Sequence, residues 1–140
     1  MKNYSLILSN HIPEETQIDV YELCKNNESL FQSFFDEIEK DGNLFGNLAG
    51  AIRIIQDTAN LQLRPKTKFR EIKGHNLKCK LYEAKQGVIR IYLFHEENKG
   101  RVIVVGGLKD NQDKDLKSVK KIIKDYQNEK ERQNQRKNTQ

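Results

Sequence analysis

The side chains best suited to chemistry lie in the middle of the chain. Arg90 interrupts an otherwise apolar run, GVIRIYLF, that begins at Gly87. Side chains alternate between the two faces of a strand, so Arg90 shares a face with Tyr92. Aliphatic residues 89, 91 and 93 fill the opposite face. We therefore expect helices to cover the aliphatic face and Arg90 to project from a face that no helix covers.

The preceding run, NLKCKLYEAK, carries a second set of polar side chains with the same alternation. Lys78, Lys80 and Tyr82 share one face, opposite the apolar residues of the run. Burial of the apolar faces of both strands would fix their register and bring the two lysines beside Arg90. Arg70, in the run KFREIK, can join them. The pattern predicts a basic sheet face in which lysine, arginine and tyrosine are interleaved.

A polar loop, KDNQDKD, follows the last strand pattern. It carries Lys109, Gln112 and Lys114, and the glycine pair before it permits a bend or a close approach of the backbone. His95 ends the strand that contains Arg90. A histidine at this place is either an ordinary surface residue or a proton carrier near neutral pH. The loop should close one end of the basic face.

Charge is distributed unevenly along the chain. Residues 1–63 contain 4 Lys/Arg against 10 Asp/Glu, whereas residues 64–109 contain 12 against 4 and residues 110–140 contain 9 against 6. A basic segment of this kind is typical of a phosphate-binding surface, although a solvated lysine-rich surface has the same composition.

Lysine, arginine and tyrosine, with or without histidine, can cleave RNA without a metal ion or cofactor, because the substrate supplies the 2′-oxygen as nucleophile. A base takes the proton, a cation stabilises the extra charge on phosphorus and an acid protonates the leaving oxygen. A lysine crowded by cations has a lowered pKa and suits the base. Arginine suits the phosphate because its fork stays charged. The sequence contains no HExxH or P-loop motif and no Ser-His-Asp spacing.

The elements that position these residues fall into an α-rich and a β-rich region. Residues 1–63 are expected to be mainly helical, with an αα-hairpin in which Ser29 caps the first helix and Gly42 ends it. YSLIL is a candidate strand and EETQIDVYELCKNN a candidate short helix. Residues 64–109 predict an antiparallel meander of about four strands and residues 114–128 a C-terminal helix. We thus predict one α+β domain over 1–128, followed by a polar, disordered tail over 129–140.

Other features concern the compartment. Cys24 and Cys79 lack a CxxC or histidine-rich context and are predicted to be reduced thiols rather than metal ligands. The N-terminus lacks the pattern of a signal peptide, and no apolar run approaches the roughly 20 residues that span a bilayer. We expect a cytoplasmic protein that does not bind a membrane.

LYEAKQGVIRIYLF, followed by RVIVVGGLKDNQDKDL, resembles the RelE/HigB-like toxins of bacterial type II toxin–antitoxin modules. The resemblance covers about residues 66–126. The positions that match the family pattern are Leu81, Tyr82, Glu83, Ala84, Gly87, Arg90, Ile91 and Phe94, then Gly107, Leu108, Lys109, Gln112 and Lys114. The common loop KKTQKTP is replaced by KDNQDKD, which contains three aspartates and no proline.

The resemblance implies an endoribonuclease that cleaves ribosome-bound mRNA, inhibits translation and is neutralised by a cognate antitoxin, a helix-turn-helix protein. It implies that Lys80, Arg90 and Lys109 are catalytic, with Arg90 on the scissile phosphate. The predicted RNA-binding residues are Arg70, Lys78, Tyr82, Tyr92, His95, Gln112 and Lys114. The acidic loop keeps open an alternative, a non-catalytic toxin of the same superfamily that acts by protein binding, as gyrase inhibitors do. A small nucleic-acid-binding module is a third possibility.

Overall fold

The computed structural model describes residues 3–12 and 15–138, with side chains up to residue 136. Its elements form an α+β fold. In chain order they are β1 (Tyr4–Leu8), β2 (Val20–Lys25), β3 (Glu28–Ser29), α1 (Leu30–Asp41), α2 (Phe45–Ala59), β4 (Phe69–Ile72), β5 (Leu81–Gln86), β6 (Ile89–Glu96), β7 (Gly100–Leu108), a 3₁₀ turn (Lys109–Asn111) and α3 (Gln112–Asn138). None of these helices is long and apolar enough to span a bilayer.

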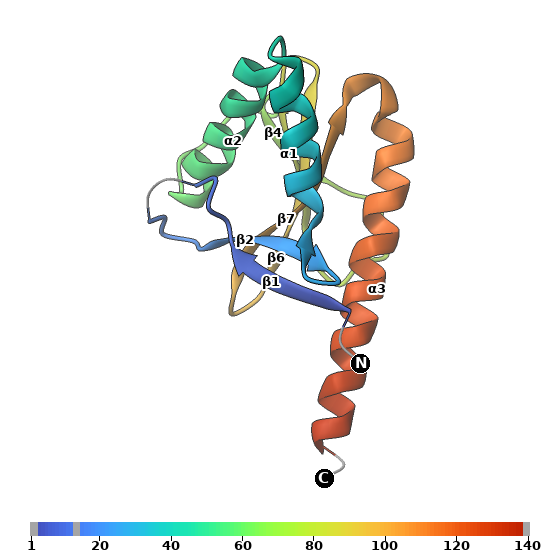
Figure 1. Ribbon diagram of the computed structural model, residues 1–140. Coiled ribbons are helices and arrows are strands. Elements are labelled where there is room, and N and C mark those ends of the chain that lie inside the picture. The colour runs from blue at the N-terminus through green and yellow to red at the C-terminus, as the bar shows by residue number, and fades with distance from the viewer. Residues whose placement is uncertain (1–2, 13–14, 139–140) are drawn as a thin grey trace.

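A mixed sheet lies between two helical layers (Figure 1). The strand order is β1-β2-β7-β6-β5-β4, and β3 pairs with β2, which makes seven strands within the described residues. The predicted meander of β4 to β7 is antiparallel, as expected. The sheet is larger than the four strands predicted, and it is mixed because β2 runs parallel to β7.

The helices α1 and α2 cover one face of the sheet. Phe31 and Leu48 pack there against Ile89, Ile91 and other aliphatic side chains of the sheet. The start of α1 follows its sequence, because the Ser29 hydroxyl accepts a hydrogen bond from the Gln32 amide at 3.1 Å. The helix ends at Gly42, whose φ of 76° suits glycine. These two helices were predicted from their apolar spacing.

The helix α3 covers the other face of the sheet. Val119 and Ile123 pack against Tyr92, Phe94 and Leu81. Farther along α3, the Tyr126 hydroxyl donates to Glu96 at 2.7 Å. The expectation that no helix covers the face carrying Arg90 is therefore wrong, since both faces of β6 are covered.

Two expectations for the chain ends need correction. Residues 129–138 are not a disordered tail but continue α3, and residues 139–140 lie outside the described residues. The buried Glu129 carboxylate accepts hydrogen bonds from the backbone N–H groups of Asn3 and Tyr4, the latter at 2.9 Å. This contact ties α3 to the start of β1, which lies beside it in Figure 1. A polar sequence is held here by hydrogen bonds rather than by apolar burial.

The segment predicted as a short N-terminal helix instead contains β2, and the candidate strand YSLIL is β1. Glu22 lies in the middle of β2, and its charge among apolar residues gave this segment the pattern of an amphipathic helix. Its carboxylate is buried and accepts hydrogen bonds from the Ser9 and Ser29 hydroxyls at 2.7 and 2.6 Å. Because these donors satisfy the charge, the strand can be central in the sheet.

Candidate functional site

The pairing of β5 with β6 decides which polar residues meet. Lys85 lies opposite Arg90, and Glu83 lies opposite Tyr92, on the face that α3 covers. Tyr82 pairs with Leu93 and lies on the opposite face. The expected arrangement, with Tyr82 and its alternating lysines beside Arg90, is therefore wrong by one residue. Both faces of β6 are buried, so its apolar residues did not specify the register.

Arg90 is 8% exposed and rigidly held. Its Nη1 donates to the backbone oxygens of Gly87 and Ile89 at 2.8 and 3.0 Å. Its Nε is enclosed without a hydrogen-bond partner, and no ion pair to Arg90 occurs among the described residues. A buried charge without a counter-charge is costly. The remaining nitrogen, Nη2, is thus the part of the guanidinium that can bind an anion.

Lys85 lies directly beside Arg90 on β5. Partial burial lowers its pKa, and Arg70 and Arg90 act in the same direction against the opposing effect of Glu83. A lowered pKa increases the fraction of neutral amine near pH 7. The neutral amine that this shift favours is the form of Lys85 that accepts a proton.

Asp115 lies at the start of α3, against Gly107 of β7. Gly107 of β7 pairs with Arg90, and an added Cβ at Gly107 would lie 2.0 Å from Asp115 Oδ2. Only glycine lets the carboxylate pack onto the strand at this point. Burial raises the pKa of Asp115, while Lys114 acts to lower it. Asp115 is thus shifted toward the protonated form, in which it can donate a proton.

Glu83 holds the start of α3 against the sheet. Its carboxylate is fully buried, and it accepts from Arg70 Nε at 2.8 Å and from Gln112 Nε2 at 2.6 Å. The Tyr92 hydroxyl lies near it, enclosed and without a well-formed hydrogen bond. Burial raises the pKa of Tyr92, and the charges of Glu83 and Asp115 raise it further. Tyr92 is therefore a neutral phenol. We call Arg70, Glu83, Lys85, Arg90, Gln112 and Asp115 the Arg90 site.

The loop residues predicted from sequence lie at this end of the sheet. Lys109 begins the 3₁₀ turn, and its backbone N–H donates to the Val88 oxygen at 2.8 Å. The side chains of Lys109 and Lys114 are exposed. Of the sequence-predicted residues, Arg70 and Gln112 bind the Glu83 carboxylate. Arg90 and Tyr92 share the α3-covered face of β6, where Tyr92 pairs with Glu83.

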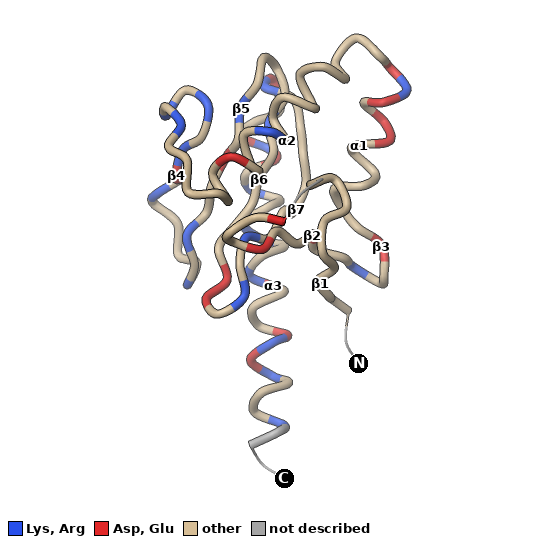
Figure 2. The backbone as a smooth tube through the Cα atoms, turned by 90° about the vertical axis from the view of Figure 1, so that its left-hand side faces the viewer, with Lys and Arg blue, Asp and Glu red and all other residues tan. Residues whose placement is uncertain are grey.

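The other predicted residues lie at the opposite end of β6. Lys78, Lys80, Tyr82 and His95 line a groove of about 790 Å³, together with residues of α3 and Arg101 of β7. We call it the His95 groove. Predicted catalytic residues Lys80 and Arg90 are thus separated by most of the length of β6. The segment that leads into the His95 groove is basic: residues 64–80 include seven Lys/Arg and one Glu. Many of these basic residues lie near β4 in Figure 2.

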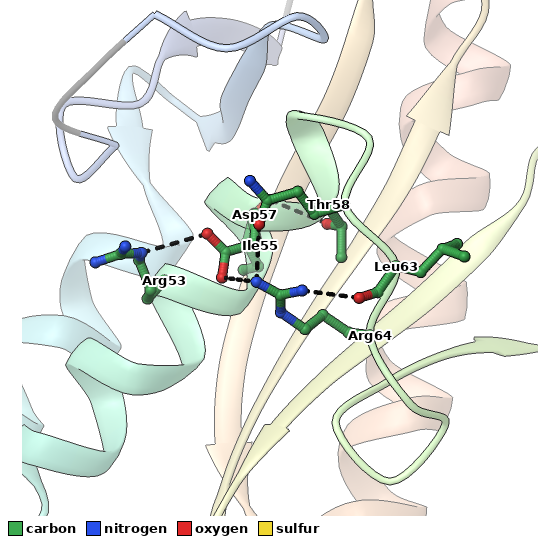
Figure 3. A network of polar contacts seen from close by, with 7 residues as sticks. Arg53, Ile55, Asp57, Thr58, Leu63 and Arg64 are labelled. Atoms are coloured by element: carbon green, nitrogen blue, oxygen red, sulfur yellow. Dashed lines mark hydrogen bonds and ion pairs between the residues drawn. The ribbon is translucent and has the colours of Figure 1, made fainter.

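Arg101 was missed in the sequence. It pairs with His95 across the β6–β7 hairpin, and its guanidinium lies over the Tyr82 ring, 4.9 Å from the centroid. Its Nη1 donates to the Thr58 hydroxyl at 3.2 Å. Thr58 in turn donates to the Ile55 oxygen in the network at the end of α2 (Figure 3). The short EENKG turn places Arg101 opposite His95, and this signal was available in the sequence.

The groove does not offer a thiolate. Burial raises the pKa of Cys79 to about 11, although a hydrogen bond with Gln127 acts to lower it. The thiol is therefore neutral near pH 7 and a weak nucleophile.

Lys85, Glu83 and Asp115 were also not singled out as site residues. Gly87 and Val88 form a two-residue hairpin loop, and Gly87 has a φ of 57°. This turn length alone places Lys85 opposite Arg90. Nothing in the sequence pattern marks the contact of Asp115 with Gly107.

No protein-family model, curated protein or solved structure matches the chain. The resemblance to RelE/HigB-like toxins thus depends only on the residues given for it above.

Proposed function

We propose that the protein is an endoribonuclease toxin of a type II toxin–antitoxin system, and that it cleaves mRNA at the Arg90 site. The observation that carries the proposal is the nearly buried Arg90, which is fixed by two backbone oxygens and makes no ion pair with a carboxylate of the described residues. An arginine of this kind suits a phosphate, since its geometry is set before the substrate binds. The resemblance adds ribosome-bound mRNA as substrate and an antitoxin as partner.

The neighbours of Arg90 supply an acid and a base. Burial shifts the pKa of Lys85 downward and that of Asp115 upward, so that the two groups are driven toward opposite roles. Lys85 takes the proton of the 2′-hydroxyl as the 2′-oxygen bonds to phosphorus. Arg90 stabilises the charge on the non-bridging oxygens. The bond from phosphorus to the 5′-oxygen breaks, and that oxygen takes a proton from Asp115.

This step forms a 2′,3′-cyclic phosphate and a 5′-hydroxyl. Lys85 then loses its extra proton to water and Asp115 regains one, which restores the site. Glu83 contacts neither reacting group in this scheme. With Arg70 and Gln112 it holds β4, β5 and the start of α3 together, so it is a positioning residue.

Translation of a reporter mRNA in a reconstituted reaction tests the proposal. Wild-type protein should cleave the message, whereas Arg90→Met should not. Arg53→Met is the matched control, because the Arg53 side chain is 73% exposed on α2. Intact mRNA with wild type, together with growth arrest that persists in Arg90→Met, would instead favour a toxin that acts by protein binding.

A further inference from the structure

The His95 groove lies well away from the Arg90 site. Arg90 and His95 are five residues apart on β6, which is about 16 Å along a strand, and their side chains point to opposite faces of the sheet. The groove volume of about 790 Å³ is ample for part of a ligand. A function at Arg90 alone leaves this second basic cavity without a role.

Two of the cations in the groove are uncompensated. Lys78 is bonded to Glu131, and Lys130 lies 3.0 Å from Glu96. By contrast, Lys80 and Arg101 make no ion pair with any described residue. Arg101 is held over Tyr82, and its enclosed Nε has no hydrogen-bond partner among the described residues. The guanidinium of Arg101 and the exposed ammonium of Lys80 are therefore available for an anion.

His95 lies between these two cations and responds to them. Burial lowers its pKa, Arg101 and Lys80 lower it further, and Glu97 opposes them. The remaining charged groups of the groove are the Lys78–Glu131 and Lys130–Glu96 ion pairs, each of which joins α3 to the rest of the groove, and Cys79 is neutral. The lowered pKa thus favours the neutral imidazole near pH 7, and His95 gains its positive charge at a lower pH than a free imidazole does.

We propose that the His95 groove binds a second phosphate of the single-stranded RNA whose scissile phosphate is held at Arg90. The inference rests on the proposed function for its substrate. Lys80 and Arg101 contact the phosphate, and His95 strengthens the contact when it is protonated. The groove therefore increases affinity and sets the position of the strand but takes no part in bond cleavage.

The salt dependence of binding tests this second contact. A fluorescent RNA of about 12 nucleotides with 2′-O-methyl riboses has no nucleophile and stays intact. Its affinity is measured by anisotropy between about 50 and 200 mM salt. Each lost phosphate contact on a single strand reduces the slope of log K against log salt by about 0.7. Lys80→Ala should show this reduction, whereas Lys66→Ala, at an exposed lysine outside the groove, should not.

The outcomes separate the two proposals. An unchanged slope in Lys80→Ala, with a reduced slope in Arg90→Met, would overturn the groove but not the Arg90 site. Unchanged slopes in both variants would overturn both. His95→Gln provides a second readout, because wild type should bind more tightly as the pH falls toward about 5 and this variant should not. If the affinity of His95→Gln still increases at low pH, His95 does not contribute to the phosphate contact.

Discussion

Replacement of Arg90 by methionine should separate activity from stability. Methionine fills most of the same volume but removes the charge. If Arg90 binds the scissile phosphate, the cleavage rate should fall by about 10²- to 10³-fold, as for the loss of one preorganised donor. The rate is measured in the reconstituted translation reaction, with Arg53→Met as the control for a lost surface arginine.

The free energy of unfolding should change little in the same variant. The loss of two hydrogen bonds to backbone oxygens costs about 1 kcal/mol each. Removal of a buried charge that makes no ion pair with any described residue gains roughly 1–4 kcal/mol. These terms oppose each other, so we expect stability within about 1 kcal/mol of wild type or somewhat above it. Urea unfolding followed by circular dichroism measures the difference.

A neighbouring residue provides the structural comparison. Ile91 is fully buried against α1 and α2, and Ile91→Ala should lower the free energy of unfolding by about 2–5 kcal/mol. If Arg90→Met destabilises the protein as strongly as Ile91→Ala does, Arg90 is a structural residue. The inference from its unpaired charge would then be refuted.

The remaining predictions concern the acid, the base, the glycine between them and the helix contact. Cleavage requires neutral Lys85 together with protonated Asp115, so the rate should fall at pH values below the pKa of Asp115, where neutral Lys85 becomes scarce. It should also fall at pH values above the pKa of Lys85, where protonated Asp115 becomes scarce. Burial raises the pKa of Asp115 and lowers that of Lys85, which narrows the pH range of activity from both sides. In Asp115→Asn the residual rate should increase with pH up to the pKa of Lys85 and then stay constant. A decrease of this rate at alkaline pH would contradict the role of Asp115 as the acid. Gly107→Ala should displace the Asp115 carboxylate, since the new Cβ would lie 2.0 Å from Oδ2, and slow cleavage about 10²-fold; an unchanged single-turnover rate would exclude this. Glu129→Gln should lower the free energy of unfolding by about 1–2 kcal/mol at an unchanged cleavage rate, and urea titration that finds no change would show that the contact with β1 adds no stability.

The sequence was sufficient for the elements whose signals are local. The helix α1 begins after Ser29 and ends at Gly42, as predicted, because capping depends on residues within one turn. The four meander strands follow from alternation and short turns. By contrast, β2 was not predicted, because Glu22 in its middle resembles a surface residue. Its carboxylate is buried only because the hydroxyls of Ser9 and Ser29, which lie in other segments, donate hydrogen bonds to it.

The candidate site was less accessible to sequence reasoning for a physical reason. Alternation shows that residues share a face, but it does not show which face a helix covers. Both faces of β6 are buried, so Arg90 lies under α3 rather than on an open surface. The polar end of α3 was taken for a tail because its attachment through Glu129 depends on backbone groups of β1.

The chemistry of the RNA ends formed during translation tests the Arg90 site most directly. If Lys85, Arg90 and Asp115 act as proposed, wild-type protein leaves 2′,3′-cyclic phosphates and 5′-hydroxyls. A message with a 2′-deoxynucleotide at the cleaved position then remains intact, as does normal message treated with Arg90→Met. Cleavage of the deoxy-substituted message, or equal cleavage by wild type and Arg90→Met, would contradict the mechanism.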